Sequence, residues 1–187
     1  HTKVWEGEKL SKEKATNLSG IENIYFVDEF KKILNSIAVK VDTFYINKNE
    51  HYRANSPVET REDRFITWLL KNYPAHNVAK SNPILQRQRS IKHPDEINQI
   101  KIACDITMKG FNRVLKFIKP NVWEYEIEAE FIHEFINNSS KGFAYSPIIA
   151  SGCDNNVLHY IKNNKKCKSG ELILMDVGAE YGNYSSD

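Results

Sequence analysis

The sequence has few cysteines and no long apolar run. Its three cysteines, Cys104, Cys153 and Cys167, are widely spaced and form no CxxC pair. This pattern argues against a disulfide framework and against a cysteine-rich zinc site, and it fits a reducing cytoplasm. No apolar run approaches the ~20 residues of a membrane-spanning helix, and the chain does not open with a signal-peptide pattern. We therefore expect a cytoplasmic protein without a membrane partner.

The sequence also lacks a large excess of either positive or negative charge. The 187 residues include 26 Lys and Arg against 24 Asp and Glu, a net charge of +2, with the lysines scattered among glutamates. This balance argues against nucleic acid or an anionic membrane as the main partner. The sequence contains no HExxH, GxSxG, phosphate-binding loop or GxGxxG motif, so it lacks the signatures of several common enzyme classes.

What the first part of the chain does contain is an alternation of strand and helix signals over residues 1–80. Val4-Trp5 and Ile24–Val27 are β-rich and are predicted to be strands. Ser11 is a suitable N-cap for a short helix, and a longer helix is expected from about Glu59 to Asn72. Such alternation predicts an α/β domain. Residues 81–94, bounded by Pro83 and Pro94 and with little periodicity, are predicted to be a linker.

Residues 95–187 show a different pattern. A long helix is expected from Asp95, its N-cap, to residue 118, with Cys104, Met108 and Leu115 among the apolar residues that recur at three- and four-residue spacing and are placed in the core. A second helix is expected over residues 123–137, followed by apolar strands near 143–150, 157–160 and 172–175. Two helices followed by antiparallel strands indicate an α+β layer.

The last predicted strand carries an aspartate at its end. The run Leu172–Met175 is unbroken and apolar, which is typical of a strand buried on both faces, and Asp176 follows it directly. Turn signals then lead to a second antiparallel strand. A hairpin folded about Tyr181-Gly182 would place Asp176 opposite Asp187, with Cβ atoms roughly 4.5–5.5 Å apart.

Two carboxylates so placed need an offsetting interaction, because at an effective dielectric of about 20 they repel by roughly 3 kcal/mol. A shared proton or one or two divalent cations between Asp176 and Asp187 would supply it. The alternative is that Asp187 lies in a solvated loop and Asp176 only caps a turn. His159, embedded in an apolar Val-Leu-His-Tyr segment, is either a hydrogen-bonded core residue or a group for acid–base or substrate-binding work.

Four motifs in the second part resemble a known family in order and spacing: Arg89–Ile97, Tyr145–Gly152, Leu158–Tyr160 and Asp176–Asp187. They resemble the aminopeptidase P (Xaa-Pro aminopeptidase) branch of the pita-bread metallopeptidases. The first part resembles the latter part of the creatinase-type N-terminal α/β domain found in this family. The resemblance implies an incomplete creatinase-like α/β domain followed by the first part of an α+β pita-bread catalytic domain.

The resemblance also implies an activity. The implied activity is that of a metal-dependent aminopeptidase, which releases the N-terminal residue from peptides with proline at the second position. Asp176 and Asp187 match two of the five ligands of a dinuclear centre, usually manganese, and His159 matches the histidine that contacts the substrate near the scissile bond. A homo-oligomer, dimer or tetramer, is also implied.

The remaining ligands of this family, a histidine and two glutamates, would lie beyond Asp187. We therefore expect the chain to be a segment of a longer protein and, on its own, inactive. Two alternatives stay open. One is a prolidase, which shares the aspartates and the histidine–tyrosine motif but cleaves Xaa-Pro dipeptides. The other is a non-catalytic pita-bread domain that binds peptides or proteins.

Overall fold

The computed structural model describes residues 2–48 and 57–187 and forms two compact units, residues 1–89 and residues 90–187. Most of the predicted linker, residues 81–94, is helical, since helix α5 spans Asn82–Ser90. Pro83 does not prevent this helix because it lies in the first turn, where a backbone N–H would have no intrahelical partner.

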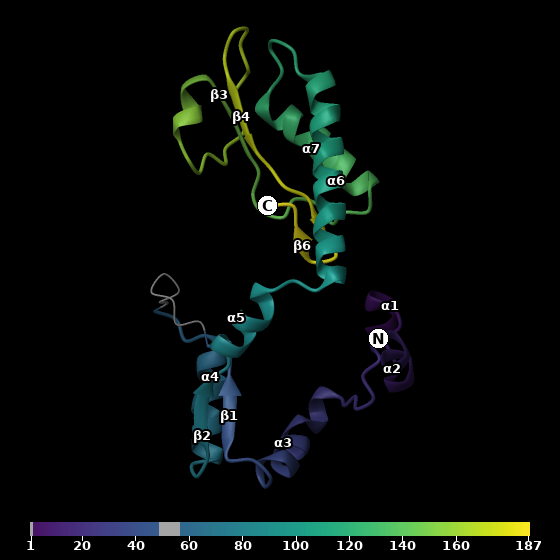
Figure 1. Ribbon diagram of the computed structural model, residues 1–187, viewed down its shortest axis with the longest axis vertical. Helices are drawn as coiled ribbons and strands as arrows, with labels where there is room; N and C mark the ends of the chain where they lie inside the picture. Colours follow the sequence, from purple (N-terminus) through teal and green to yellow (C-terminus); the bar gives the residue numbers. More distant parts are fainter. Residues whose placement is uncertain (1, 49–56) are drawn as a thin grey trace. The chain divides into compact units, whose positions relative to one another are not determined.

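The first unit contains a βαβ arrangement (Figure 1). Strand β1 (Thr43–Ile46) pairs in parallel with β2 (Asn77–Lys80), and helix α4 (Arg61–Asn72) connects them in sequence. The elements before β1 are α1 (Thr2–Glu6), α2 (Lys12–Ser19), the 3-10 helix η1 (Val27–Glu29) and α3 (Phe30–Ala38). The α/β pattern predicted for this part is confirmed.

Two of the strands predicted there are wrong. Val4-Trp5 lies in helix α1, and Ile24–Val27 enters η1 without pairing to another strand. Val4 and Val27 are 85% and 89% exposed, so neither segment gains the cross-strand packing from which β propensity arises. The N-cap at Ser11 is confirmed, because its side chain accepts a hydrogen bond from the Lys14 amide.

The second unit packs two helices against short antiparallel strands, as predicted. Helices α6 (Pro94–Phe117) and α7 (Glu124–Asn137) lie alongside each other, and β3 (Ile148–Ser151) pairs with β4 (Ile173–Asp176) (Figure 1). The 3-10 helix η3 (Gly152–Asn156) follows β3, and β5 (Glu180–Tyr181) and β6 (Tyr184–Ser185) form a hairpin. The core between these layers includes Phe131, Phe135 and Ile149, each fully buried.

The face that α6 buries differs from the predicted one. Cys104 is exposed, and Met108 and Leu115 are 55% and 65% exposed. Phe111, also predicted to lie in the core, does contact the Phe131 ring of α7, with ring centroids 5.0 Å apart. The closest approach to α7 is at Gly110, where a Cβ would lie 2.8 Å from the Phe135 ring and 2.9 Å from the Phe131 ring. The two large rings require small residues opposite them, which a search for large apolar side chains does not detect. The N-cap of the helix is His93, two residues before the predicted N-cap Asp95.

Strand β4 is buried on one face only. Ile173 and Met175 pack against the core, whereas Leu172 and Leu174 are 80% and 40% exposed. The prediction of a strand buried on both faces is therefore wrong for the part of the chain that the structure describes.

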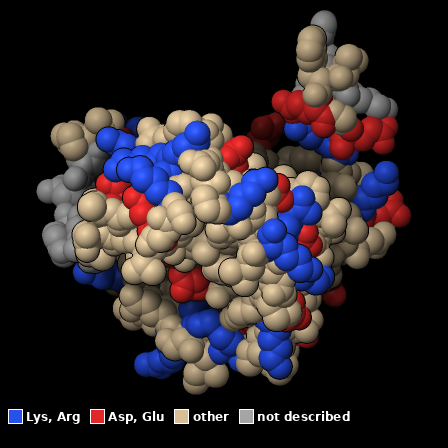
Figure 2. Space-filling view, turned by 90° about the horizontal axis from the view of Figure 1, so that it is seen from above, with Lys and Arg blue, Asp and Glu red and all other residues tan. Residues whose placement is uncertain are grey.

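On the face of the molecule seen in Figure 2, basic and acidic side chains are interspersed, as the near-balanced charge predicts. None of the described helices is long and apolar enough to span a membrane.

Candidate functional site

The terminal hairpin turns at Gly182-Asn183, one residue later than predicted. Its register pairs Glu180 with Ser185 and Tyr181 with Tyr184. Both turn residues have positive φ, 58° and 66°, as a type I′ turn requires, and glycine and asparagine tolerate this conformation far better than Tyr181 would. The shift removes the predicted pairing of the two aspartates.

Asp176 instead lies opposite Ile148 at the end of β4. The prediction that Asp176 directly faces Asp187 across a hairpin is therefore wrong. Both side chains nevertheless line one cavity of about 500 Å³, together with His159. The complete lining consists of Tyr145, Ser146, Ile148, His159, Ile161, Asp176 and Asp187. The structure thus brings together the three site residues proposed from the sequence.

The Tyr145 hydroxyl interacts with both aspartates. It donates a 2.7 Å hydrogen bond to Asp176 Oδ1. Burial is the main cause that raises the Tyr145 pKa above its ordinary value, and hydrogen bonding to Asp176 and Asp187 adds to it. The phenol therefore stays protonated as a donor to the carboxylates. The predicted strand near 143–150 begins only at Ile148, so Tyr145 lies before it and not within it. The sequence places Tyr145 in the Tyr145–Gly152 motif but indicates no role for it.

The residue before Asp187 is fixed to the body of the unit. Ser186 Oγ lies 2.8 Å from Thr107 Oγ1 of α6 and accepts a hydrogen bond from the Ala179 amide at 3.1 Å. A Cβ on Gly178 would come within 2.9 Å of Ser186 Oγ and 3.2 Å of the Tyr145 ring. Glycine at this position therefore permits the close approach of the two groups that hold the aspartates.

His159 is exposed and lies in a turn after η3, not in a strand. Its neighbour Leu158 is 86% exposed, so the predicted strand over residues 157–160 is wrong and the core interpretation of His159 is wrong with it. The apolar residues around the histidine suggested a buried strand, but they find no partner strand in the described chain. An exposed imidazole at a cavity can both donate and accept hydrogen bonds.

The chemistry of the donor set fits a hard divalent cation in part. Asp176 and Asp187 offer carboxylate oxygens, which suit magnesium, calcium or manganese. Within residues 2–48 and 57–187, no group of three or more His, Cys, Asp or Glu side chains is placed to hold a metal ion. The described residues thus supply part of a ligand set, and a tightly bound ion needs further donors.

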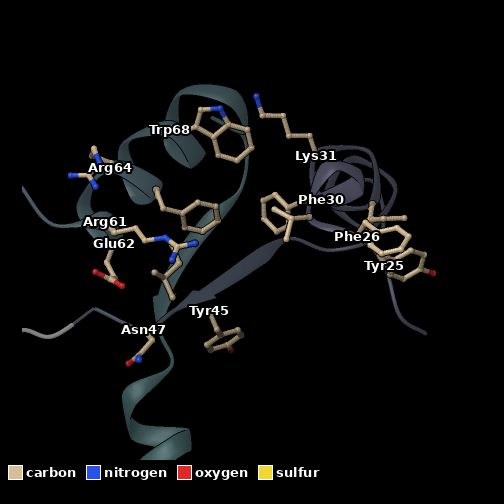
Figure 3. A pocket seen from close by; sticks show the side chains of 14 residues that line it. Tyr25, Phe26, Phe30, Lys31, Tyr45, Asn47, Arg61, Glu62, Arg64 and Trp68 are labelled. Carbon is tan, nitrogen blue, oxygen red and sulfur yellow. The ribbon is translucent and has the colours of Figure 1, made fainter. Parts of the chain in front are cut away.

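A larger cavity of about 940 Å³ lies in the first unit, but its lining offers different chemistry. Figure 3 shows aromatic side chains of α3 and α4, with Phe30 on one side and Trp68 on the other. Arg61 and Arg64 line it beside one acidic residue, Glu62. Because the residues that line it include neither a histidine nor a pair of carboxylates, it offers no counterpart to the arrangement around Asp176.

Two family models match the chain. Residues 98–187 match metallopeptidase family M24, and residues 1–45 match the N-terminal domain of aminopeptidase P. The first match contains Tyr145, His159, Asp176 and Asp187. The order of the matches along the chain agrees with the predicted order of an N-terminal α/β domain and a catalytic domain.

Individual proteins give the same result. The chain is 29% identical to Xaa-Pro aminopeptidase of Haemophilus influenzae over 98% of its own length and 40% of that protein. A Bacillus anthracis structure provisionally assigned to aminopeptidase P matches with a TM-score of 0.91 and 31% identity, over 100% of this chain and 44% of that one. A variant of Escherichia coli aminopeptidase P in complex with substrate matches with a TM-score of 0.85 and 25% identity, over 98% and 42%.

The chain thus spans about two fifths of the length of these relatives. The predicted fold class, a creatinase-type α/β domain followed by the first part of a pita-bread catalytic domain, is confirmed by these structures. Together, the two family matches and the structural similarity show a metallopeptidase family M24 domain over residues 98–187, preceded by a segment, residues 1–45, that matches the N-terminal domain of aminopeptidase P.

Proposed function

We propose that this chain is part of a metal-dependent aminopeptidase that releases the N-terminal residue from peptides with proline at the second position. The observation that carries the proposal is the convergence of Asp176, Asp187 and His159 on one cavity in the region matched to family M24. The similarity to proteins named Xaa-Pro aminopeptidase supports the substrate class.

Asp176 and Asp187 are proposed as ligands of a centre of two divalent metal ions, with manganese as the expected metal. When bound, such ions activate a water molecule and polarise the scissile carbonyl. Tyr145 donates to Asp176 Oδ1 and so fixes the orientation of that carboxylate. His159 is proposed as the catalytic residue that hydrogen-bonds the substrate near the scissile bond, because its exposed imidazole lines the same cavity.

The test is an assay of the full-length protein with manganese. We expect cleavage of an Xaa-Pro-Xaa tripeptide, and an Asp176→Ala variant with reduced metal content and at least a hundredfold lower activity, on the order expected when an essential metal ligand is lost. Glu130→Gln serves as the control, because it alters a carboxylate of α7 that is paired with Arg113 of α6. Equal metal content in wild type and Asp176→Ala would refute the ligand assignment.

The substrate assay separates the alternatives. Cleavage of the Xaa-Pro dipeptide without cleavage of the tripeptide would identify a prolidase. Peptide binding without cleavage or bound metal would identify a binding module. The 187-residue segment alone is expected to be inactive, because two carboxylates form an incomplete ligand set; peptidase activity of the purified segment with manganese would contradict this expectation.

A cytoplasmic location and a homo-oligomeric state, dimer or tetramer, complete the proposal. The three cysteines are free, and Cys104 and Cys153 are exposed, which supports a reducing compartment. Light scattering of the full-length protein at several concentrations tests the oligomeric state, and a monomeric mass at all concentrations would contradict it.

A further inference from the structure

His159 lies in a segment whose position depends on side-chain contacts. Residues 157–165 follow η3 and contain no helix or strand, so no backbone ladder fixes them. Two residues of this segment are nevertheless buried: Tyr160, which is 7% exposed, and Asn163, which is 3% exposed. The partners of these two side chains therefore help to determine where the segment can lie, and with it the turn of residues 158–159 that contains His159 and directly precedes Tyr160.

The partner of Tyr160 is Glu124, a fully buried carboxylate at the first position of α7. Glu124 Oε2 accepts the Tyr160 hydroxyl at 2.8 Å and the Lys165 amide at 2.9 Å. Its Oε1 accepts the amide of Ser151 at 2.8 Å and the Ser151 hydroxyl at 2.7 Å. One carboxylate thus joins the helix, the end of β3 and two points, Tyr160 and Lys165, of the segment that continues from His159.

Asn163 provides a second, separate anchor for the same segment. Its Oδ1 accepts the Ile149 amide of β3 at 3.0 Å, and its Nδ2 donates to the Pro147 carbonyl at 3.0 Å and to Glu128 Oε2 at 2.9 Å. Asn163 therefore fixes the far end of the segment. The anchor next to His159 is Tyr160, and Tyr160 depends on Glu124.

Burying a carboxylate completely costs free energy unless its oxygens accept hydrogen bonds. Each of the two Glu124 oxygens accepts two hydrogen bonds, so the carboxylate is fully satisfied. Burial, followed by the hydrogen bond to Glu124, raises the pKa of Tyr160 to about 12, so the phenol remains a donor. Leucine or methionine could fill the same volume but could not accept hydrogen bonds from Ser151, Tyr160 and Lys165.

We propose that Glu124 is a positioning residue: through Tyr160, Ser151 and Lys165 it holds the turn that presents His159 to the cavity. The expected effect of Glu124 on catalysis rests on the proposed function, whereas its role as an anchor of residues 157–165 does not. Glu124 itself does not touch the cavity, since it is absent from the lining residues and is 0% exposed.

The informative substitution is Glu124→Gln, which keeps the shape of the side chain. A glutamine has one carbonyl oxygen and one NH₂ group, so either Ser151 or Lys165 loses an acceptor for its backbone amide and faces another donor. Tyr160→Phe is the milder variant, because it removes a single hydrogen bond and keeps the ring in place.

Kinetics of the full-length protein with manganese and an Xaa-Pro-Xaa tripeptide test the catalytic consequence. In Glu124→Gln we expect kcat to fall roughly ten- to a hundredfold, as misplacement of a reacting group by about 1 Å does, with KM and metal content little changed. Tyr160→Phe should show a smaller loss of kcat. In a His159→Ala background Glu124→Gln should cause no further loss, because the group it positions is gone. An equal fold loss in both backgrounds would overturn the proposal.

Hydrogen exchange of the same full-length variants tests the anchor independently of activity. We expect faster exchange in residues 157–165 of Glu124→Gln, with helix α6 unchanged, and no change in the control Glu130→Gln, whose partly exposed carboxylate pairs with Arg113. Unchanged exchange in 157–165 would overturn the anchor. A wild-type protein without peptidase activity would refute the proposed function, and exchange would still decide for or against the anchor.

Discussion

At the scale of single residues, the phenol of Tyr145 is the contact that orders the carboxylate proposed as a metal ligand. Its hydroxyl is 2.7 Å from Asp176 Oδ1. The sequence could indicate Asp176 and His159 because ionisable residues stand out within or beside apolar runs, and it could indicate Asp187 through the resemblance of the Asp176–Asp187 motif, since the hairpin register that also led to Asp187 was wrong. It could not indicate the role of Tyr145, since tyrosine is common beside strands and only the fold brings it to Asp176.

Tyr145→Phe is expected to lower the manganese affinity of the full-length protein about 10- to 100-fold, the usual effect of losing a group that orients a metal ligand. The ring remains, so packing against Gly178 is kept. Titration of the metal-free protein with manganese measures the effect. Tyr125→Phe is the matched control, because Tyr125 is 50% exposed and stacks on Trp123 through its ring. Equal affinities of Tyr145→Phe and wild type would contradict the role given to Tyr145.

Glu124 shows why part of the site could not be predicted from the sequence. A glutamate in the first turn of a helix is normally explained by the helix dipole and by solvent exposure. Nothing in the local pattern indicates that residues from 151 to 165 will fold over Glu124 and bury it completely. Its four hydrogen bonds are long-range contacts, which only the tertiary structure specifies.

Asp63 gives a prediction of pH dependence. A hydrogen bond from Lys48, followed by those from Thr60, lowers the pKa of Asp63 to about 2, from an ordinary value of 3.8. Because the folded-state pKa is the lower one, the stabilisation is complete above about pH 4 and is lost as the pH falls towards 2.

Thermal unfolding between pH 5 and pH 2 should therefore show a smaller decrease in Tm for Asp63→Asn than for the wild type. The neutral side chain is already unable to bind Lys48 as an ion pair at pH 5. Asp105→Asn, a change at an exposed position of α6, should follow the wild-type profile. An Asp63→Asn profile parallel to that of the wild type over this range would contradict the assignment.

At the scale of secondary-structure elements, the pair α6 and α7 could be predicted from periodicity, but the buried face of α6 could not. Helical spacing of apolar residues located both helices correctly. The face was partly misassigned because large side chains such as Met108 were placed inside, whereas the contact with α7 is made at Gly110 and by Phe111, whose ring meets that of Phe131. Similarly, the terminal hairpin was expected, and its register was missed because Gly182 is compatible with either turn.

Gly110→Ala tests this contact. Alanine favours the helix by up to about 1 kcal/mol, but overpacking of a core costs about 1–3 kcal/mol, so the substitution should be destabilising on balance. The added Cβ would lie 2.8 Å and 2.9 Å from the rings of Phe135 and Phe131, and both rings are fully buried and cannot move aside freely. Urea unfolding measures the change. Lys101→Ala, at an exposed position of the same helix, should change stability by less than about 0.5 kcal/mol. A Gly110→Ala protein more stable than the wild type would show that the helices separate without cost.

At the scale of the whole molecule, the two units differ in how much apolar surface they bury. In the described part of the first unit, Ala38 and Leu69 are the buried hydrophobic residues. The second unit has a contiguous core around Phe131, Phe135 and Ile149. Since burial of apolar surface is the main source of stability, each unit should open with its own free energy.

Native-state hydrogen exchange of the 187-residue chain should therefore show lower protection in α4 than in α7. In both helices the N3 carboxylate accepts the N-cap amide, Asp63 that of Thr60 in α4 and Glu126 that of Trp123 in α7, and only in α4 does the N-cap side chain cap the helix in return, so local capping cannot account for lower protection in α4. What differs is burial: α4 contributes Leu69 to the buried set, whereas α7 contributes Ile127, Phe131 and Phe135. The free energy of local opening, obtained from amide exchange in the middle of each helix, checks the prediction. If the α4 amides exchange as slowly as those of α7, the two units open together, and stability in this chain is not set by the core of each unit.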